Sequence, residues 1–247
     1  MKEQTITKLR EMKLQGFMLA YKEQEANSQY QDMTFEDRFS LLVEKEHLRR
    51  ANNLLQRIRK SATLPISCQI ADIDFSQNRG ISKKTLLEHS NCSWVYQHKN
   101  LIITGATGCG KTYMSSALSD SALKNGLKVK YYKTHDLLSE FHFYREKQEL
   151  PRLLTLLSKF DLLVFDEWLR DNFQLEESRF VLDLIDLRFR NKSAIFVSQL
   201  PLEKWHSRLG EATIADAILD RIIHDSYKLS LEGDSMRKKT SGLEGSI

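Results

Sequence analysis

The sequence predicts an α/β fold in which a five-stranded parallel sheet follows an all-helical N-terminal domain. Two observations support this prediction. From residue 100 onward, short apolar runs alternate with amphipathic stretches, which is typical of a doubly wound parallel sheet with helices between its strands. Between residues 5 and 60, apolar side chains recur at helical spacing within a highly charged background.

These changes of pattern divide the 247 residues into four predicted parts. Residues 1–65 form a helical domain, residues 66–99 a connecting segment, residues 100–240 the sheet domain, and residues 241–247 a frayed tail. Pro65 marks the first boundary, because proline disfavours the helical conformation in the residue before it.

Composition limits the class of protein. With 41% hydrophobic and 28% charged residues, the chain is unlike a disordered or fibrous protein. Its 3 cysteines lack the C-x-x-C spacing of a zinc site and do not form a disulfide framework, which fits a reducing compartment. No apolar run approaches about 18 residues and the N-terminus lacks a secretory signal, so we expect a cytoplasmic protein without a membrane span.

The formal net charge of +4 is unevenly distributed. Residues 1–99 contain 16 basic and 12 acidic residues, a net charge of +4, whereas residues 100–247 contain 21 of each. The excess is steepest between residues 47 and 65, which hold no acidic residue. The Lys and Arg residues of this run are Arg49, Arg50, Arg57, Arg59 and Lys60. Such a run is either a solvated helix face or a binding surface for a polyanion, and charge alone leaves both interpretations open.

The N-terminal pattern predicts two helices. Apolar residues from Ile6 to Tyr21 define the first and those from Phe35 to Ile58 the second, with a break at residues 27–29. Thr34 precedes two acidic residues and is the predicted N-cap of the second helix. In the connecting segment, residues 82–87 predict a short capped helix. The five predicted strands are residues 101–104, 128–132, 162–165, 194–197 and 227–231.

Residues 105–112, GATGCGKT, match the phosphate-binding pattern G-x-x-x-x-G-K-[ST] between a predicted strand and a predicted helix. Glycines in such a loop let backbone N–H groups surround phosphate oxygens, and the positive end of the helix dipole adds to the attraction. The motif predicts ATP binding with Mg²⁺: Lys111 contacts the β- and γ-phosphates, and the Thr112 hydroxyl binds the metal. The predicted nucleotide contacts here are Gly105, Ala106, Thr107, Gly108, Cys109, Gly110, Lys111, Thr112 and Tyr113.

Two acidic residues end the third predicted strand, in the sequence LLVFDE at 162–167. Parallel sheets bind ligands at the carboxyl ends of their strands. Asp166 is predicted to hold Mg²⁺ through water, and Glu167 to polarise the water that attacks the γ-phosphate. Two acids alone could equally begin a helix, but together with Lys111 and Thr112 they indicate the second half of a nucleoside triphosphatase site.

Two further polar residues belong to the predicted site. Gln199 follows the fourth predicted strand and is therefore expected near the γ-phosphate. Arg221 lies on a predicted helix whose apolar stripe of isoleucines turns the arginine away from the core. Arg221 either pairs with acids or the helix dipole nearby or presents its charge to the nucleotide of another subunit. The register of the helix is compatible with both interpretations.

The motifs GATGCGKT, LLVFDEW, FVSQLPLEKWH and ADAILDRI, with GDSMR at 233–237, together resemble the IstB-like ATP-binding helper proteins of bacterial insertion sequences. The resemblance covers nearly the whole chain, including the basic run and IADIDFS at 70–76. It implies a AAA+ P-loop NTPase with a minimal or absent C-terminal lid, related to DnaC-type helicase loaders and more distantly to DnaA-type initiators.

This resemblance also implies roles for individual residues. Gln199 matches a sensor that orients water or contacts the γ-phosphate. Arg221 matches the arginine finger, which acts on a neighbouring subunit's nucleotide, and Arg237 matches a second sensor that contacts the nucleotide. Glycine is common soon after the acid pair in family members, whereas this chain continues with the sequence WLRD at 168–171. The absence of this glycine bears on the conformation of the local turn and on the rate of ATP turnover.

Residues 134–159 resemble an extra helix that faces DNA in the initiator and loader group. The candidate DNA contacts in this segment are His142, Arg145, Lys147 and Arg152. An amphipathic helix with Leu137, Leu138, Phe141 and Tyr144 in its core explains the same segment equally well.

Together, these features predict an ATP-hydrolysing, DNA-binding factor for transposition. ATP bound between subunits favours a dimer or higher oligomer, in which weak contacts to the phosphates of duplex DNA are multiplied without strong sequence specificity. The predicted DNA contacts are Arg49, Arg50, Arg57, Arg59, Lys60, Arg145 and Lys147. The assembly presents DNA to a cognate transposase. Three alternatives stay open: a DnaC-like replicative helicase loader, a small-molecule kinase, and an ATP-gated scaffold with negligible turnover.

Overall fold

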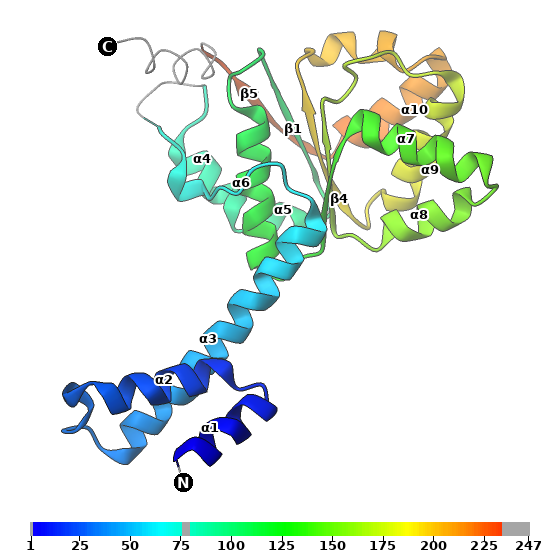
Figure 1. Cartoon of the computed structure of the whole chain (residues 1–247). Helices are drawn as coiled ribbons and strands as arrows, with labels where there is room; N and C mark the ends of the chain where they lie inside the picture. Colours follow the sequence, from blue (N-terminus) through cyan, green and yellow to red (C-terminus); the bar gives the residue numbers. More distant parts are fainter. Residues whose placement is uncertain (1, 76–79, 234–247) are drawn as a thin grey trace, which may run out of the picture. The chain divides into compact units, whose positions relative to one another are not determined.

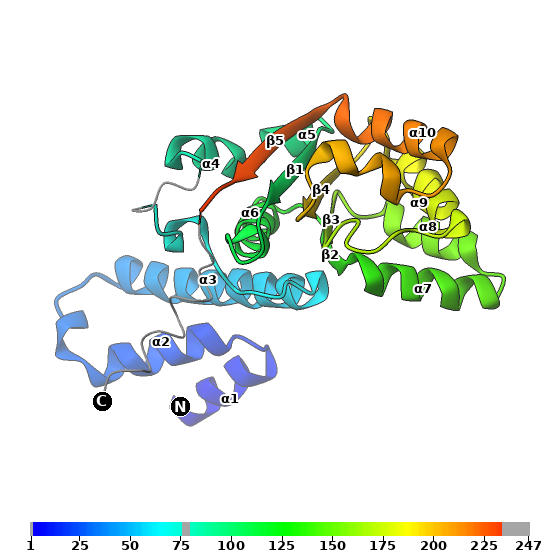
Figure 2. The ribbon, with the colours of Figure 1, turned by 90° about the horizontal axis from the view of Figure 1, so that it is seen from above.

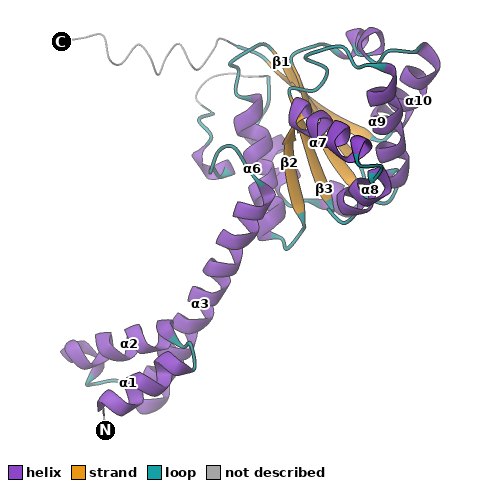
Figure 3. Ribbon diagram, turned by 45° about the vertical axis from the view of Figure 1, so that its right-hand side comes forward, coloured by secondary structure: helices purple, strands orange, loops and turns teal. Residues whose placement is uncertain are grey.

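The five predicted strands form one parallel sheet in the computed structural model, which describes residues 2–75 and 80–233. The strands are β1 (Asn100–Gly105), β2 (Val129–Lys133), β3 (Leu162–Asp166), β4 (Ser193–Ser198) and β5 (Ser226–Leu231). Their order is β2-β3-β4-β1-β5, with every neighbouring pair parallel. Figure 3 shows strands of this sheet in orange. All carboxyl ends therefore meet at one edge of the sheet, and the prediction of a five-stranded parallel sheet is confirmed.

Helices cover both faces of this sheet. On one face lies α6 (Lys111–Lys124), as Figure 2 shows. The opposite side carries α7 (Thr134–Glu146), α8 (Leu150–Ser158), α9 (Leu175–Arg188) and α10 (Ala212–Ile223) (Figures 1 and 2). Strand residues Ile102, Phe165 and Phe196 face this second layer and share one buried apolar cluster with its helices. The alternation of side chains along each strand thus supplies two cores, one for each face.

Both tryptophans that follow the third and fourth strands are packing residues. Trp168 and Trp205 are 1% and 0% exposed and contact each other with their ring centroids 6.2 Å apart. The Trp205 indole N–H donates to the carbonyl oxygen of Leu200 at 3.1 Å. These contacts attach the segments after β3 and β4 to the core, so that the polar residues beside them have fixed positions.

The structure divides into two compact units, Met1–Ile58 and Arg59–Ile247. The first contains α1 (Lys2–Glu11), α2 (Gln15–Ala26) and most of α3 (Phe35–Ala62). Thr34 caps α3 as predicted, because its hydroxyl accepts the Asp37 backbone N–H at 3.2 Å. The prediction of one helix from Ile6 to Tyr21 is wrong, since α1 ends at Glu11. Lys13 takes a left-handed conformation there (φ 59°), a role for which a glycine would have been the usual signal.

A buried carboxylate fastens the start of α2 to α3. The Glu46 Oε2 atom accepts the backbone N–H groups of Gly16 at 2.6 Å and Phe17 at 3.2 Å. The side chains of Arg50 and Arg49 also donate to Glu46, at 2.7 Å and 3.3 Å. Burial by itself raises the pKa of Glu46, but the hydrogen bonds from the two arginines and the two N–H groups outweigh it and hold this pKa at about 2.

Glu46→Gln is expected to destabilise the first unit at neutral pH and to remove most of its acid sensitivity. The folded-state pKa of about 2 lies below the ordinary value of 4.5, so the charge of Glu46 stabilises this unit above pH 4.5, and the stabilisation is lost as the pH falls toward 2. Hydrogen exchange of peptides from residues 14–20, corrected for intrinsic rates, measures the effect. Glu44→Gln, at an exposed site two residues away, is the control. If protection from hydrogen exchange fell with pH in the same way in Glu46→Gln and in the parent, the role of Glu46 would be contradicted.

The connecting segment belongs to the second unit. It contains α4 (Lys83–Ser90) and α5 (Ser93–Tyr96), together with a 3₁₀ turn at Ile70–Asp72. Ser82 caps α4 as predicted, accepting the Thr85 N–H at 3.0 Å.

Three further 3₁₀ turns lie outside the connecting segment, at Ser28–Tyr30, Leu202–Lys204 and His206–Arg208. Among residues 2–75 and 80–233, no helix is both long and apolar enough to cross a membrane. The predicted tail at 241–247 lies outside the described residues, as does the chain from 234 in which a lid would begin.

Candidate nucleotide-binding site

The phosphate-binding motif forms the loop between β1 and α6. Three of its glycines, Gly105, Gly108 and Gly110, have positive φ angles of 150°, 83° and 99°. At Gly105 a Cβ atom would also lie 2.3 Å from the carbonyl oxygen of Leu231 on β5. Both backbone conformation and space therefore require glycine at this position. The loop ends where α6 begins, which directs the N-terminus of that helix at the loop's interior.

Lys111 lies across the loop that it terminates. Its Nζ atom donates hydrogen bonds of 2.7 Å to the carbonyl oxygens of both Gly105 and Ala106. Only 8% of the residue is exposed, and this burial lowers the pKa of Lys111. The Cys109 side chain is buried and its Sγ atom lies 3.9 Å from the same ammonium group. The ammonium group is thus held at the loop by neutral acceptors that phosphate oxygens can replace.

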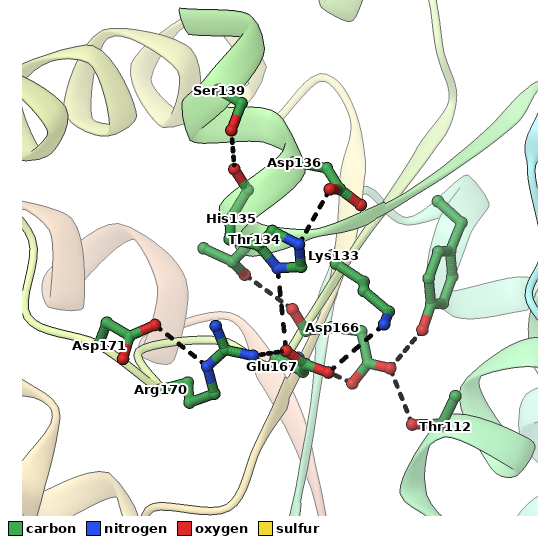
Figure 4. A network of polar contacts seen from close by, with 11 residues as sticks. Thr112, Lys133, Thr134, His135, Asp136, Ser139, Asp166, Glu167, Arg170 and Asp171 are labelled. Atoms are coloured by element: carbon green, nitrogen blue, oxygen red, sulfur yellow. Dashed lines mark hydrogen bonds and ion pairs between the residues drawn. The ribbon is translucent and has the colours of Figure 1, made fainter. Parts of the chain in front are cut away.

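Thr112 and Asp166 come together from different elements, as the two motifs predicted. The Thr112 hydroxyl donates to Asp166 Oδ2 at 2.8 Å, and the backbone N–H of Glu167 donates to Asp166 Oδ1 at 2.8 Å (Figure 4). Asp166 is only 4% exposed. A hydroxyl beside a carboxylate at a sheet edge offers hard oxygen donors, the kind that Mg²⁺ prefers, and these two side chains fit the predicted metal.

Tyr131 is a further member of this group that the motifs did not reveal. Its phenol group on β2 donates a short hydrogen bond to Asp166 Oδ2, the oxygen that also accepts from Thr112. Burial, with the charge of Asp166, raises the pKa of Tyr131 well above its ordinary value, so the phenol remains a donor at neutral pH. In the sequence Tyr131 is one more apolar residue of a buried strand, and nothing in the strand pattern distinguishes it.

Glu167 faces several basic side chains of its own subunit. Its carboxylate forms an ion pair with Arg170, three residues along the chain. Lys133 Nζ lies 3.8 Å from Glu167 Oε1, and His135 Nδ1 lies 3.9 Å from Oε2 (Figure 4). Lys133 ends β2 and His135 lies in the first turn of α7, so parallel pairing of β2 with β3 brings them to the acid pair. Sequence motifs did not single out Lys133 and His135, because their proximity to Glu167 depends on the sheet order.

Gln199 lies beside the loop, where its position after β4 led us to expect it. Its Oε1 atom accepts a hydrogen bond from the Thr107 hydroxyl at 2.8 Å. In the pairing of β4 with β1, Ser198 lies opposite Thr104. Gln199 directly follows Ser198, and the phosphate-binding loop directly follows Thr104. Gln199 and the phosphate-binding loop therefore share one edge of the sheet.

Arg221 lies at the opposite edge. The Asn100 side chain, at the start of β1, donates to the Arg221 carbonyl oxygen at 3.4 Å, whereas the loop begins at Gly105, the last residue of β1. Five residue steps along a strand span about 17 Å. The Arg221 guanidinium forms an ion pair with Asp186 on α9 and donates to the Ala217 carbonyl oxygen at 2.8 Å. Arg221 is thus paired within its own subunit, but with an acid of another helix and not with a neighbour of Asp220, and its backbone lies at the far end of β1 from the loop.

The predicted DNA contacts have different surroundings. Arg49 and Arg50 hold Glu46. Arg59 forms a two-pronged ion pair with Asp120, with contacts of 2.5 Å and 2.8 Å. Arg57 and Lys60 are exposed, and neither side chain forms an ion pair within residues 2–75 and 80–233. The structure thus leaves two of the five basic side chains without an acidic neighbour in the part of the chain that it describes.

Residues 134–159 form two helices, α7 and α8, and not the single helix that was expected. Gln148 takes a left-handed conformation (φ 57°) between them. Leu137 and Phe141 are buried against the sheet, which supports the packing interpretation of α7. The polar candidates contact their own neighbours: Arg145 pairs with Glu176, Lys147 Nζ lies 4.0 Å above the Phe143 ring, His142 contacts Glu177 at 2.8 Å, and Arg152 contacts Glu149 at 3.0 Å. Arg237 lies outside the described residues.

Residues 7–243 match the family model described as IstB-like ATP binding protein. A putative insertion sequence ATP-binding protein of Sinorhizobium fredii is 29% identical over 95% of this chain and 96% of its own length. A putative ATP-binding protein of an insertion sequence from Pseudomonas fluorescens is 30% identical over 81% of this chain and 87% of its own.

Among solved structures, the chain resembles DnaI with a TM-score of 0.56 and 18% identity, covering 73% of this chain and 92% of that one. It resembles the DnaC helicase loader with a TM-score of 0.52 and 20% identity, covering 70% and 98%. An AMPPCP-bound DnaA from Aquifex aeolicus matches with a TM-score of 0.56 and 16% identity, covering 74% and 55%. At these identities the likeness concerns the fold alone.

Proposed function

We propose, because this chain belongs to the IstB-like ATP-binding protein family, that it hydrolyses ATP, assembles on duplex DNA and assists a cognate transposase. Its fold is that of a AAA+ P-loop NTPase, as the family resemblance implied. The observation that carries the proposal is the contact between Thr112 and Asp166, which joins the phosphate-binding loop to the acid pair at one edge of the sheet.

The residues of the site divide the work of hydrolysis. Lys111 and the backbone N–H groups of the loop bind the phosphates and balance their charge. Thr112 and Asp166 hold Mg²⁺, which when bound neutralises charge on the phosphates. Glu167 accepts a proton from the attacking water, and Gln199 orients that water or contacts the γ-phosphate. Tyr131 keeps the Asp166 carboxylate in place by its hydrogen bond.

Arg221 completes the site of a neighbouring subunit in this proposal. Its backbone lies beside the start of β1, about 17 Å along the strand from the loop of its own subunit, so we assign Arg221 to the nucleotide of a neighbouring subunit. In the single subunit Arg221 is paired with Asp186, so assembly exchanges this ion pair for one with phosphate. ATP bound between two subunits then stabilises the oligomer, because it binds the assembled form more tightly than the free subunit.

DNA binding follows from repetition of weak contacts in this oligomer. Arg57 and Lys60 are the first candidates, since both are exposed and lack an acidic partner in the described residues. Two cations per subunit release few counterions, so one subunit alone binds duplex DNA weakly at physiological salt. Each added subunit raises the effective concentration of the next contact, so that affinity increases with assembly.

The relatives favour transposition over the alternative of a helicase loader. Proteins named for insertion sequences match this chain at 29% and 30% identity over most of its length. The likeness to the DnaC loader, at 20% identity, concerns the fold. Retention of the chain by a replicative helicase, and not by the transposase of the same element, would reverse this preference.

Glu167→Gln is expected to lower the rate of ATP hydrolysis on the order of a hundredfold or more while ATP binding changes little. Glutamine keeps the size of the side chain but cannot accept the proton, and a positioned general base contributes at least that factor. ATP should then keep the variant on DNA longer than the parent. Phosphate release measures turnover, and fluorescence anisotropy of a labelled duplex with ATP, without nucleotide and after a salt jump measures binding.

Two results would contradict the proposal. Unchanged hydrolysis in Glu167→Gln would exclude Glu167 as the base. Equal DNA affinity of the parent with and without ATP, with no change in sedimentation, would exclude assembly driven by nucleotide. Phosphate transfer to a small acceptor molecule would instead favour the kinase alternative.

A further inference from the structure

Arg170 belongs to the polar network around Glu167, and the proposed function assigns it no role. Arg170 is half-exposed, with 50% of its side chain accessible. Its Nη1 atom donates to Glu167 Oε2, and its Nε atom donates to Asp171 Oδ2 at 3.0 Å (Figure 4). Arg170 therefore holds the carboxylate that the proposed mechanism uses as its base.

The backbone between Glu167 and Arg170 is shaped to bring these side chains together. Glu167 and Leu169 both have φ 56°, a left-handed conformation that is uncommon for residues other than glycine. The Arg170 N–H donates to the Glu167 carbonyl oxygen at 3.1 Å and closes the turn. Buried Trp168 anchors this turn. Its backbone N–H donates to the carbonyl oxygen of Val197, and its own carbonyl oxygen accepts a hydrogen bond from the Ser198 hydroxyl at 2.7 Å. Packing of Trp168 thus maintains a turn in which Arg170 faces Glu167.

This ion pair competes with the proposed reaction. A general base must offer an oxygen lone pair to the attacking water. In the free subunit Oε2 of Glu167 accepts a charge-assisted hydrogen bond from Arg170, and Oε1 faces Lys133 at 3.8 Å. The guanidinium therefore competes with a water molecule for the lone pairs of Oε2.

The surroundings of Arg170 allow it to be drawn away by an anion. Its second partner, Asp171, is 73% exposed, so that ion pair is weak in water. Lys133 and His135 also lie beside Glu167 and are about half-exposed. A phosphate group that draws Arg170 away therefore leaves two other basic side chains near Glu167.

We propose that Arg170 is a positioning residue that withholds the Glu167 carboxylate in the free subunit, and that a polyanion which binds Arg170 releases this carboxylate for hydrolysis. This inference rests on the proposed function of Glu167 as the base. It makes the turn after the acid pair a sensor for DNA phosphate, which joins DNA binding to ATP turnover within one subunit.

The test compares steady-state phosphate release by the full chain with Mg-ATP, with and without duplex DNA of arbitrary sequence. Arg170→Ala should raise kcat without DNA several-fold, leave the KM for ATP near that of the parent, and reduce the stimulation by DNA toward a ratio of one. Arg170→Lys keeps the charge and should stay closer to the parent. Arg179→Ala, an exposed arginine on α9, is the matched control and should behave like the parent. A gain in kcat also separates the proposal from misfolding, which lowers activity.

Each remaining outcome has one meaning. If Glu167→Gln abolishes turnover but Arg170→Ala hydrolyses ATP without DNA no faster than the parent, Arg170 does not withhold the base and the inference is wrong. Undiminished DNA stimulation in Arg170→Ala would overturn the sensor role. If neither the parent nor any variant shows turnover that depends on Glu167, the proposed function fails and the inference fails with it.

Discussion

Lys111→Ala is expected to abolish nucleotide binding in practice, with a loss of affinity on the order of a thousandfold. The Lys111 ammonium group makes two hydrogen bonds to loop carbonyl oxygens, which phosphate oxygens replace in the bound state. Two charge-assisted hydrogen bonds of about 2 kcal/mol each account for that factor. Titration of a fluorescent ATP analogue measures the affinity, and every step that depends on ATP should be lost with it.

Thr112→Ser is the matched control for this variant. Serine keeps the hydroxyl that contacts Asp166 at 2.8 Å, so nucleotide binding should stay within a few-fold of the parent. Thermal unfolding of Lys111→Ala checks that the loop is intact, because removal of the lysine also frees the carbonyl oxygens of Gly105 and Ala106. Parental affinity in a folded Lys111→Ala protein would place the nucleotide elsewhere.

Arg188→Leu is expected to cost the second unit about 3–5 kcal/mol of unfolding free energy. Arg188 ends α9 and is 4% exposed. It donates at 2.9 Å to the carbonyl oxygens of Leu157 and Phe160 and at 2.7 Å to that of Ser193. Leucine replaces only the apolar stem of the arginine and leaves these three acceptors without their donor. Burial lowers the pKa of Arg188 to about 10, so it remains a cation at neutral pH and the loss is present there.

Urea unfolding followed by tryptophan fluorescence measures this loss, since Trp94, Trp168 and Trp205 all lie in the second unit. Arg179→Leu, at an exposed position of the same helix, should stay within about 0.5 kcal/mol of the parent. Similar unfolding curves for the two variants would mean that the carbonyl oxygens find other donors.

Periodicity was sufficient to predict the sheet but not every helix boundary. Strands β3 and β4 are buried along their whole length, so each appears as a short apolar run whatever its neighbours are. The break between α1 and α2 was missed because Lys13 takes a left-handed conformation without the glycine that usually indicates one. Gln148 explains the missed break between α7 and α8 in the same way.

The site was predictable to the extent that it consists of local motifs. Lys111 and Thr112 follow from one loop, and Asp166 and Glu167 from one strand end, because phosphate and Mg²⁺ chemistry requires these side chains at fixed spacings. Tyr131, Lys133 and His135 come from β2 and the start of α7, and no motif connects them to the acid pair. Only the pairing of β2 with β3 brings them there.

The sequence by itself determined that this chain folds as a P-loop sheet with a nucleotide-binding loop and an acid pair, since both depend on residues close together along the chain. The tertiary structure decided which charges remain free. Arg59 is paired with Asp120, Arg221 with Asp186 and Arg170 with Glu167. A side chain's charge is a property of its sequence position, but its availability depends on which partner the fold brings within hydrogen-bonding distance.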